Sequence, residues 1–144
     1  GTPRHGYGVE SWPDGATYEG QFEAGRVHGH AVYRESSGAK YDGQWVGGKQ
    51  HGEGTHVSEN GSKYKGQFQH GLKNGHGEIF LADGSTYYGE IVDNLMHGPG
   101  HYEWIDGNTY EGEWVNNLMH GKGVYTFKDG CEYRGEYRDN EKNG

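Results

Sequence analysis

Residues 110–133 read YEGEWVNNLMHGKGVYTFKDGCEY and contain one full period of the pattern that decides the fold. The period is 23 residues, because a tyrosine returns at that interval along the whole chain: Tyr18, Tyr41, Tyr64, Tyr87, Tyr110 and Tyr133. A glycine follows each of these tyrosines by two residues, and a large apolar residue follows the glycine by two more. Such periods are typical of arrays in which each repeat packs on its neighbours.

Each repeat contains two runs in which apolar and polar residues alternate. In the last complete repeat the first run carries Tyr110, Gly112 and Trp114, and the second carries Gly123 and Tyr125. Alternation with period two places these residues on one face of a β-strand. A glycine on that face removes a side chain and lets a neighbouring ring lie against the backbone. We therefore predict two antiparallel strands per repeat with an aromatic core.

Two kinds of connection join the predicted strands. Asn-Gly or Asp-Gly pairs precede most of the repeated tyrosines, as in Asp83-Gly84, and favour two-residue hairpin turns whose central residues both need a positive φ. The second connection carries only Gly or Asn seven residues after the repeated tyrosine: Gly25, Gly48, Gly71, Asn94, Asn117 and Asn140. These two residue types tolerate the left-handed region best, so a positive φ is predicted at this position.

The repeat fills the chain as one array. We divide it into a partial repeat at 1–17, full repeats at 18–40, 41–63, 64–86, 87–109 and 110–132, and a partial repeat at 133–144. Both ends fall within a repeat, as expected for a piece of a longer array. The predicted fold is all-β, an elongated single-layer solenoid of stacked antiparallel hairpins with a right-handed twist. Two strands per repeat advance it by about 10 Å.

The composition by itself is closer to that of a disordered chain than to that of a folded array. Leu, Ile, Val and Phe make up only 19 of 144 residues and the net charge is −8, which is close to the disordered class. The 12 tyrosines and 4 tryptophans argue against disorder. One cysteine excludes an intramolecular disulfide framework and fits a reducing compartment. No apolar run is long enough to cross a bilayer, and the overall acidity argues against nucleic-acid binding.

The pattern Tyr-x-Gly-x-Trp-x-x-Gly-x-x-His-Gly-x-Gly, followed by Asp-Gly-x-x-Tyr, resembles the MORN repeat (membrane occupation and recognition nexus) over the whole chain. Few positions depart from it: Ala31 replaces a glycine, Ile91 an aromatic residue, and Asn74 and Asn143 a histidine. The resemblance implies a single-layer sheet and a non-enzymatic scaffold similar to the pure-repeat cytoskeletal proteins of protists. It also implies cytoskeletal protein partners, a cytoplasmic, cytoskeleton-associated location and, from the family name, phospholipid binding.

The charge distribution bears on the phospholipid expectation. No Lys or Arg occurs between Lys73 and Lys122, and that stretch holds eight acidic residues. Anionic membranes recruit clustered basic residues, so they would repel this stretch. A peripheral membrane module that uses the scattered basic residues of the N-terminal repeats stays open as an alternative. The acidic stretch is either a solvated face or a docking surface for a basic partner.

Our first hypothesis is a scaffold that forms a homodimer through its C-terminal repeats, residues 87–144. The residues assigned to this interface are Leu118, Met119, Cys131, Tyr133 and Tyr137. A further hypothesis is a docking rail for a basic peptide or helix along the aromatic face. Its partner-binding residues are Leu72, Leu95, Met96, Trp104 and Trp114. Exposed Leu and Met mark adaptable interfaces, although these loops could instead fold over the sheet and bury them.

Ten histidines raise the question of a metal site. Successive motif histidines should lie about 10 Å apart, too far to share one zinc ion, so no metal and no cofactor is expected within one chain. We expect these histidines to hold the connections by hydrogen bonds to backbone. A dimer could bring histidine and Cys131 of two chains together, which leaves an inter-chain zinc site open. Ser, His and Asp occupy repeat-fixed positions, so we expect no catalytic triad and no enzyme.

Overall fold

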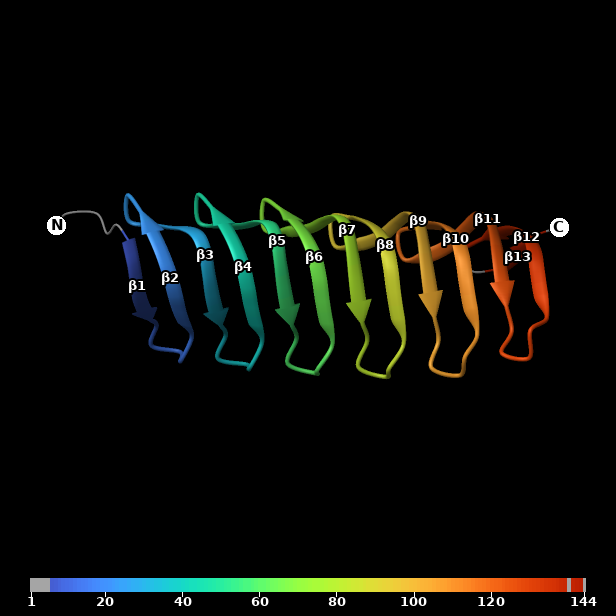
Figure 1. Ribbon diagram of the computed structural model, residues 1–144, viewed down its shortest axis with the longest axis horizontal. Helices are drawn as coiled ribbons and strands as arrows, with labels where there is room; N and C mark the ends of the chain where they lie inside the picture. The colour runs from blue at the N-terminus through green and yellow to red at the C-terminus, as the bar shows by residue number, and fades with distance from the viewer. Residues whose placement is uncertain (1–5, 140, 144) are drawn as a thin grey trace. The chain divides into compact units, whose positions relative to one another are not determined.

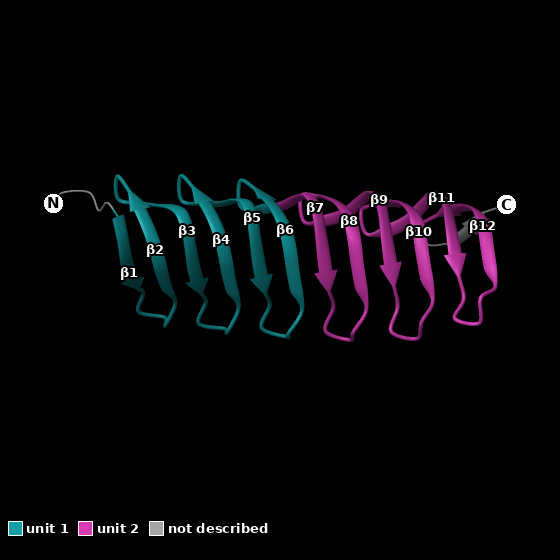
Figure 2. Ribbon diagram, viewed as in Figure 1, with its two compact units in different colours: residues 1–72 teal, residues 73–144 magenta. Residues whose placement is uncertain are grey.

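The computed structural model describes residues 6–139 and 141–143, with side chains for 6–139. Over these residues the chain forms β-strands joined by short connections, and no helix occurs among them. Its contacts divide it into two compact units, Gly1–Leu72 and Lys73–Gly144 (Figure 2). Each unit is described here by itself.

Consecutive strands along the chain are joined into hairpins in both units. Unit 1 contains β1 (Gly6–Ser11), β2 (Thr17–Glu23), β3 (Arg26–Arg34), β4 (Lys40–Val46), β5 (Lys49–Val57) and β6 (Lys63–Gln69). Strand β7 (Leu72–Phe80) begins on the last residue of unit 1. Unit 2 continues with β8 (Thr86–Val92), β9 (Leu95–Glu103), β10 (Thr109–Val115), β11 (Leu118–Thr126), β12 (Glu132–Arg138) and β13 (Glu141–Asn143).

Within each unit every strand pairs antiparallel with the strands before and after it in sequence (Figure 1). The predicted all-β sheet of stacked antiparallel hairpins is therefore confirmed. The register brings equivalent residues of successive strands opposite each other, so that Tyr110 faces Tyr102 on one side and Tyr125 on the other. The glycines follow the same rule, because Gly112 faces both Gly100 and Gly123.

This glycine ladder makes room for the tyrosines. A Cβ atom on Gly123 would lie 2.3 Å from the hydroxyl of Tyr110, and one on Gly100 would lie 2.2 Å from that of Tyr87. The repeated tyrosines Tyr18, Tyr41, Tyr64, Tyr87 and Tyr110 are all at most 1% exposed. Where the next apolar position is aromatic, the tyrosine ring contacts it edge-on, as Tyr110 does with Trp114 at 5.3 Å. The predicted packing of rings against glycine is confirmed.

Each buried tyrosine also binds the backbone of its own strand. The hydroxyl of Tyr110 donates to the carbonyl of Glu113 (3.1 Å), and the hydroxyl of Tyr41 donates to that of Gln44 (2.8 Å). Both carbonyls belong to positions where the ladder shifts register, between Gly112 and Trp114 in one strand and between Gly43 and Trp45 in the other. The tyrosine hydroxyl thus donates to a carbonyl that lies beside an irregularity of the ladder. Without this donor the carbonyl would lack a partner, and the sheet would be less stable.

The connections inside the repeats, between the first strand and the second, are two-residue turns in which both residues have a positive φ. Asn116 and Asn117 have φ values of 48° and 72°, and Gly47 and Gly48 have 59° and 84°. Two successive left-handed residues between antiparallel strands define a type I′ turn. The predicted positive φ is confirmed at Gly25, Gly48, Gly71, Asn94 and Asn117, while Asn140 lies outside the described residues.

The prediction of two-residue turns at the Asp-Gly pairs is wrong. At Asp106-Gly107 only the glycine has a positive φ (97°), and the Gly107 amide donates to the carbonyl of Trp104. This geometry is a three-residue loop, in which a type I turn is followed by one left-handed residue. The aspartate has another function there, because its carboxylate accepts the amide of Asn108 two residues later (3.1 Å). An Asx turn therefore explains the preference for Asp or Asn at this position.

Candidate docking surfaces

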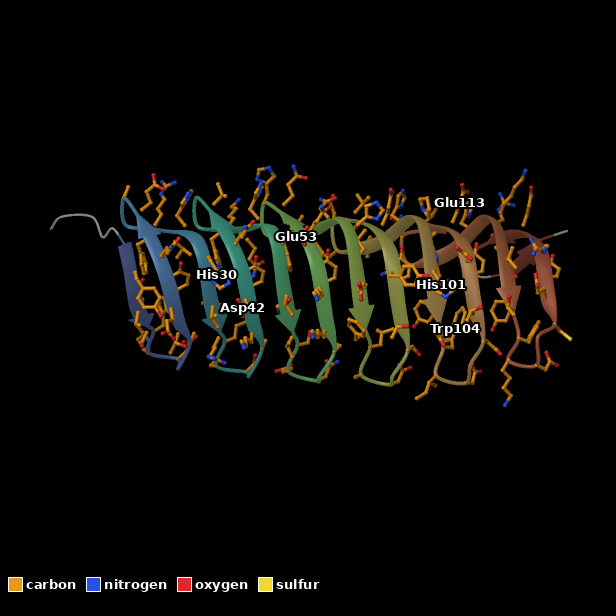
Figure 3. All side chains as sticks on the ribbon, viewed as in Figure 1. His30, Asp42, Glu53, His101, Trp104 and Glu113 are labelled. Atoms are coloured by element: carbon orange, nitrogen blue, oxygen red, sulfur yellow. The ribbon has the colours of Figure 1, made fainter. Side chains whose placement is uncertain are left out.

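Unit 2 presents two different sheet faces. Along β10 the burial alternates, so that Tyr110 and Trp114 point into the core face and Glu111 and Glu113 point to the opposite, outer face. Strand β8 follows the same alternation with Tyr88 and Glu90 outside. Figure 3 shows that Trp104 lies towards the three-residue loops, whereas Glu113 lies towards the type I′ turns. Binding surfaces can therefore be sought separately on each face.

Several residues assigned to interfaces are buried in the chain itself. Trp114 and Tyr137 are each 3% exposed and Met119 is 8% exposed. Met119 lies opposite Trp114 in the β10–β11 pairing, so both side chains face the core. Met119 therefore fits the alternative in which the segments with exposed Leu and Met fold over the sheet and bury their side chains. Packing within the chain accounts for the burial of all three residues.

The other assigned residues reach the surface to differing degrees. Leu72 and Cys131 are exposed. The half-buried ones are Leu95, Met96, Trp104, Leu118 and Tyr133. Of the residues assigned to interfaces, these seven are accessible enough to contact a partner. Their roles in binding stay predictions.

Four aromatic side chains form a continuous row on the core face of unit 2, next to the three-residue loops. This aromatic row consists of Tyr102, Trp104, Tyr125 and Phe127, with ring centroids 4.5, 5.3 and 4.9 Å apart in that order. Phe127 is 37% exposed and the other three are half-buried. The row rests on the core, because Tyr102 also contacts Trp114 at 5.6 Å. It is a rigid, partly accessible aromatic surface.

Polar groups fix the row in place and give it an acidic border. The side-chain amide of Asn108 donates to the hydroxyl of Tyr125 (3.0 Å). Burial raises the pKa of Tyr102, and a hydrogen bond with Ser85 partly opposes that shift. Asp106 and Asp129 lie in the loops beside the row, each held by an amide two residues later. Lys128 lies beside Asp129, and the two aspartates leave the border with a net negative charge, which favours a ligand that carries positive charge.

The outer face of unit 2 carries an aliphatic row beside the type I′ turns. This aliphatic row consists of Val92, Leu95, Val115 and Leu118. Val92 lies opposite Leu95, and Val115 opposite Leu118, so each pair shares one face of its hairpin. Val92 is 43% exposed and the other three are half-buried.

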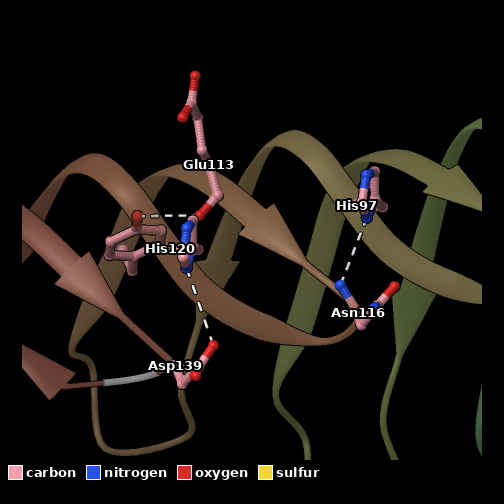
Figure 4. A network of polar contacts seen from close by, with 6 residues as sticks. His97, Glu113, Asn116, His120 and Asp139 are labelled. Carbon is pink, nitrogen blue, oxygen red and sulfur yellow. Dashed lines mark hydrogen bonds and ion pairs between the residues drawn. The ribbon is translucent and has the colours of Figure 1, made fainter.

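Three of the motif positions, His97, His120 and Asn74, contact the type I′ turn of the following repeat, whereas Nε2 of His28 lies 3.3 Å from a carboxylate oxygen of Glu23 in its own repeat. The amide of Asn116 donates to Nδ1 of His97 (3.4 Å), and Nδ1 of His120 lies 3.8 Å from a carboxylate oxygen of Asp139 (Figure 4). Asn74 replaces the histidine by donating its side-chain amide to Asp93 (2.8 Å). The expected bond to backbone is thus found at His97, while His120 and Asn74 face side chains instead. These contacts tie successive repeats together.

The sequence did not predict a positive φ for the glycine that follows each motif histidine. Gly98 and Gly121 have φ values of 98° and 72°, and a Cβ on Gly121 would meet the carboxylate of Glu113 at 2.4 Å. Both glycines lie where β9 and β11 are irregularly paired with the preceding strand. The return of glycine at this position in every repeat was the available signal, because the positive φ favours glycine and the side chain of the preceding strand leaves no room for a Cβ.

The described residues contain no group of three or more His, Cys, Asp or Glu side chains placed to hold a metal ion. Cys131 is an exposed free thiol, and its amide donates to the carboxylate of Asp129 (2.9 Å). The inter-chain zinc site therefore stays an untested prediction. Among the same residues, no helix has the length and apolar character that a membrane span requires.

The two units differ in charge. Unit 1 has eight acidic and seven basic residues, whereas unit 2 has thirteen acidic and six basic ones. Among the bases, Lys73 lies in the inward-facing position that Met96 and Met119 occupy in later repeats, and burial lowers its pKa. Unit 2 therefore carries nearly all of the net negative charge.

This fold defines a class of protein, the arrays of stacked antiparallel hairpin repeats. A sequence model of the MORN repeat matches residues 3–17, 18–40, 41–63, 64–86, 87–109, 110–132 and 133–144. The chain belongs to the MORN repeat family, which is a family of repeat binding modules rather than of enzymes. The resemblance inferred from the sequence is thereby confirmed.

The solved structures that match this chain are distant from it in sequence. The TCP domain of SAS-4 from Drosophila melanogaster, in complex with a proline-rich motif of Ana2, has a TM-score of 0.53 and 13% identity, covering 88% of this chain and 69% of that one. Virginiamycin B lyase from Staphylococcus aureus has a TM-score of only 0.20 and 11% identity, covering 93% and 42%. The first likeness is one of fold alone. A comparison with curated protein sequences finds no match.

Proposed function

We propose that this chain is a non-catalytic docking scaffold that binds an extended, proline-rich protein segment with basic residues along the aromatic row of unit 2. The observation that carries the proposal is the row itself, four aromatic side chains in unbroken contact and partly exposed on one face. Aromatic-lined surfaces are the usual docking sites of polyproline II segments, which lose little entropy on binding.

The periodicity of the array supports this choice of ligand. Equivalent positions of successive repeats, such as Tyr102 and Tyr125, are separated by two strand spacings, or about 9.6 Å. A polyproline II helix has three residues per turn and advances by about 9.3 Å per turn. Every third residue of such a segment would therefore meet the same position of the next repeat. The SAS-4 domain, which shares the fold, was solved with a proline-rich motif bound.

The experiment is a calorimetric titration with a synthetic proline-rich peptide that carries arginines, compared with a Gly/Ser-rich peptide of the same length and charge. We expect the proline-rich peptide to bind and Trp104→Ala to weaken it at least tenfold, since aromatic anchors dominate such sites. The control is Tyr88→Ala, which removes an exposed ring from the outer face. Equal binding of the two peptides, or unchanged binding by Trp104→Ala, would refute the proposal.

Self-association is a second proposal, which the accessible positions of the assigned interface support. Leu118 is half-buried, Cys131 is exposed, and both lie in the last full repeat. A symmetric homodimer is the commonest closed assembly. We expect twice the monomer mass in light scattering at tens of micromolar, and a monomer for Leu118→Lys. A wild-type chain that stays monomeric under these conditions would end this proposal.

The cellular context forms part of the same proposal. A docking scaffold with one free cysteine suits a cytoplasmic, cytoskeleton-associated protein with cytoskeletal partners. Phospholipid binding through the basic residues of the N-terminal repeats is the competing membrane proposal. Vesicles containing phosphatidylserine would pellet the chain at low salt if that proposal holds, and would leave it in solution if docking to protein is the sole function.

A further inference from the structure

We propose that the outer face of unit 2 is a second docking surface, which takes a basic amphipathic helix of a partner protein. The surface consists of the aliphatic row (Val92, Leu95, Val115 and Leu118) and, next to it, an acidic row made of Glu90 and Glu113. It lies on the opposite face from the aromatic row, so it goes beyond the peptide docking proposed above. It shares Leu118 with the proposed dimer, and the test below separates these two occupants.

The two rows are neighbours by strand geometry. Glu90 and Val92 alternate with the buried Ile91 on β8, and Glu113 and Val115 alternate with the buried Trp114 on β10. Residues two apart on a strand point to the same face. Each carboxylate therefore stands directly beside an aliphatic side chain, twice in succession. Figure 4 shows the side chain of Glu113 projecting away from the contact between His120 and Asp139.

Unit 1 serves as an internal comparison, because the same positions are chemically different there. The acidic positions are glutamines in unit 1, Gln21, Gln44 and Gln67. The first two hairpins of unit 1 carry charged residues in place of the leucines, since Glu23 faces Arg26 and Val46 faces Lys49. The fold thus tolerates polar residues at all these positions. The aliphatic and acidic pairing is confined to unit 2 and is not required to build a repeat.

Glutamine and glutamate also take the same place in the structure. The carboxylate of Glu113 lies over Gly121, where a Cβ would approach it to 2.4 Å, and the amide oxygen of Gln44 lies over Gly52, where the equivalent distance is 2.3 Å. Changing Glu to Gln here therefore removes the charge while keeping the shape. What distinguishes unit 2 at this row is negative charge alone.

The spacing of the aliphatic pairs also accommodates a helix, and the acidic row favours one that carries basic residues. The aliphatic pair Val92 and Leu95 recurs as Val115 and Leu118 one repeat later, at about 9.6 Å. A helix that crosses the strands returns to the same face after seven residues, or about 10.5 Å. Leucines seven residues apart would therefore each meet one aliphatic pair. Lysines or arginines on the adjoining stripe of the helix would meet Glu90 and Glu113, giving complementary charge.

The test uses a synthetic peptide of about three heptads, with leucines at helical spacing and lysines on one flank, titrated against the whole chain by fluorescence anisotropy. A scrambled peptide of the same composition controls for charge alone. We expect the double variant Glu90→Gln and Glu113→Gln to weaken binding about three- to tenfold, mostly at low salt. Leu95→Ser with Leu118→Ser should weaken binding at least tenfold. Trp104→Ala should leave it unchanged.

The matched control is Glu103→Gln, which removes an exposed carboxylate from the far end of β9 and should have little effect. Circular dichroism establishes that each variant is folded. Three results would overturn the proposal. The first is equal binding of the scrambled peptide. The second is loss of vesicle pelleting in the Leu95→Ser and Leu118→Ser variant, which assigns the row to a lipid surface. The third is a wild-type chain that does not bind the peptide but forms a dimer that this variant loses, which assigns the row to a second copy.

Discussion

Replacing Gly112 by alanine tests the packing of the sheet most severely. A Cβ atom there would lie 2.6 Å from the Cα of Gly123 and 2.7 Å from the carbonyl oxygen of Lys122, both backbone atoms of the paired strand. It would also lie 2.7 Å from the hydroxyl of Tyr110. Because the backbone of a paired strand cannot rotate away as a side chain can, the two strands must separate locally.

The expected cost follows from two losses. Overpacking a close-fitted site costs about 1–3 kcal/mol. Displacement of Tyr110 breaks its hydrogen bond to the carbonyl of Glu113, and an unsatisfied buried group costs about 1–3 kcal/mol more. We expect a loss of about 3–5 kcal/mol for Gly112→Ala. For a chain of this length that lowers the unfolding temperature by about 10–15 °C.

The assay is thermal and urea unfolding followed by circular dichroism, with two matched variants. Glu111→Ala changes an exposed residue of the same strand and should be nearly neutral. Gly123→Ala should cost about 1–2 kcal/mol, because the three atoms nearest to its Cβ all belong to the ring end of Tyr110, a side chain that can shift. The chain already has alanine at the equivalent Ala31, and there Tyr18 keeps its bond to Gln21. If Gly112→Ala unfolds like Glu111→Ala, the close-packing account fails.

Three further predictions concern single side chains. Tyr110→Phe removes the hydrogen bond to Glu113 and should lower the free energy of unfolding in urea by about 1–3 kcal/mol. Tyr137→Phe should be neutral or stabilising, because the buried hydroxyl of Tyr137 has no hydrogen-bond partner among the described residues. Equal losses in the two variants would contradict this prediction. Burial raises the pKa of Tyr18, Tyr41 and Tyr64 to about 12 from 10.0, so their contribution to stability is complete below pH 10 and is lost as the pH rises towards 12. Exposed tyrosines can ionise in the folded chain, but the last part of the tyrosinate absorbance at about 295 nm should appear together with unfolding, and full ionisation in a folded chain would count against burial. Asn117→Ala should destabilise the chain by about 1–3 kcal/mol, and Asn117→Gly by less. Both variants lose the hydrogen bond from the Met96 amide to the Asn117 side chain, but only alanine is strained at a φ of 72°. The reverse order in thermal unfolding would refute the turn assignment.

The sequence predicted the parts of the fold that depend on periodicity. A 23-residue spacing with alternating residues requires hairpins, and the Gly or Asn restriction at Asn94 and its equivalents follows from the left-handed backbone. The turn type at the Asp-Gly pairs was wrong, because the same dipeptide suits a two-residue and a three-residue loop. Only the ladder register, with the Gly107 amide bonded to Trp104, distinguishes them.

The candidate surfaces were harder to predict than the fold. Alternation placed Trp114 and Tyr137 on an apolar face but did not reveal that other parts of the chain cover it. The Leu-Met pairs were recognised as unusual, yet only the pairing of Met119 with Trp114 and of Leu118 with Val115 shows that the two residues face opposite sides. Burial by neighbouring repeats depends on three-dimensional packing, which spacing along one strand does not encode.

The central claim is that a proline-rich segment docks on the aromatic row, and intermolecular nuclear Overhauser contacts test it most directly. The measurement uses the whole chain with the arginine-bearing proline-rich peptide bound. The account predicts contacts from proline ring protons to the rings of Trp104 and Tyr125, recurring at every third residue of the peptide. A bound peptide whose contacts fall on outer-face residues such as Val92, with none to Trp104, would contradict it.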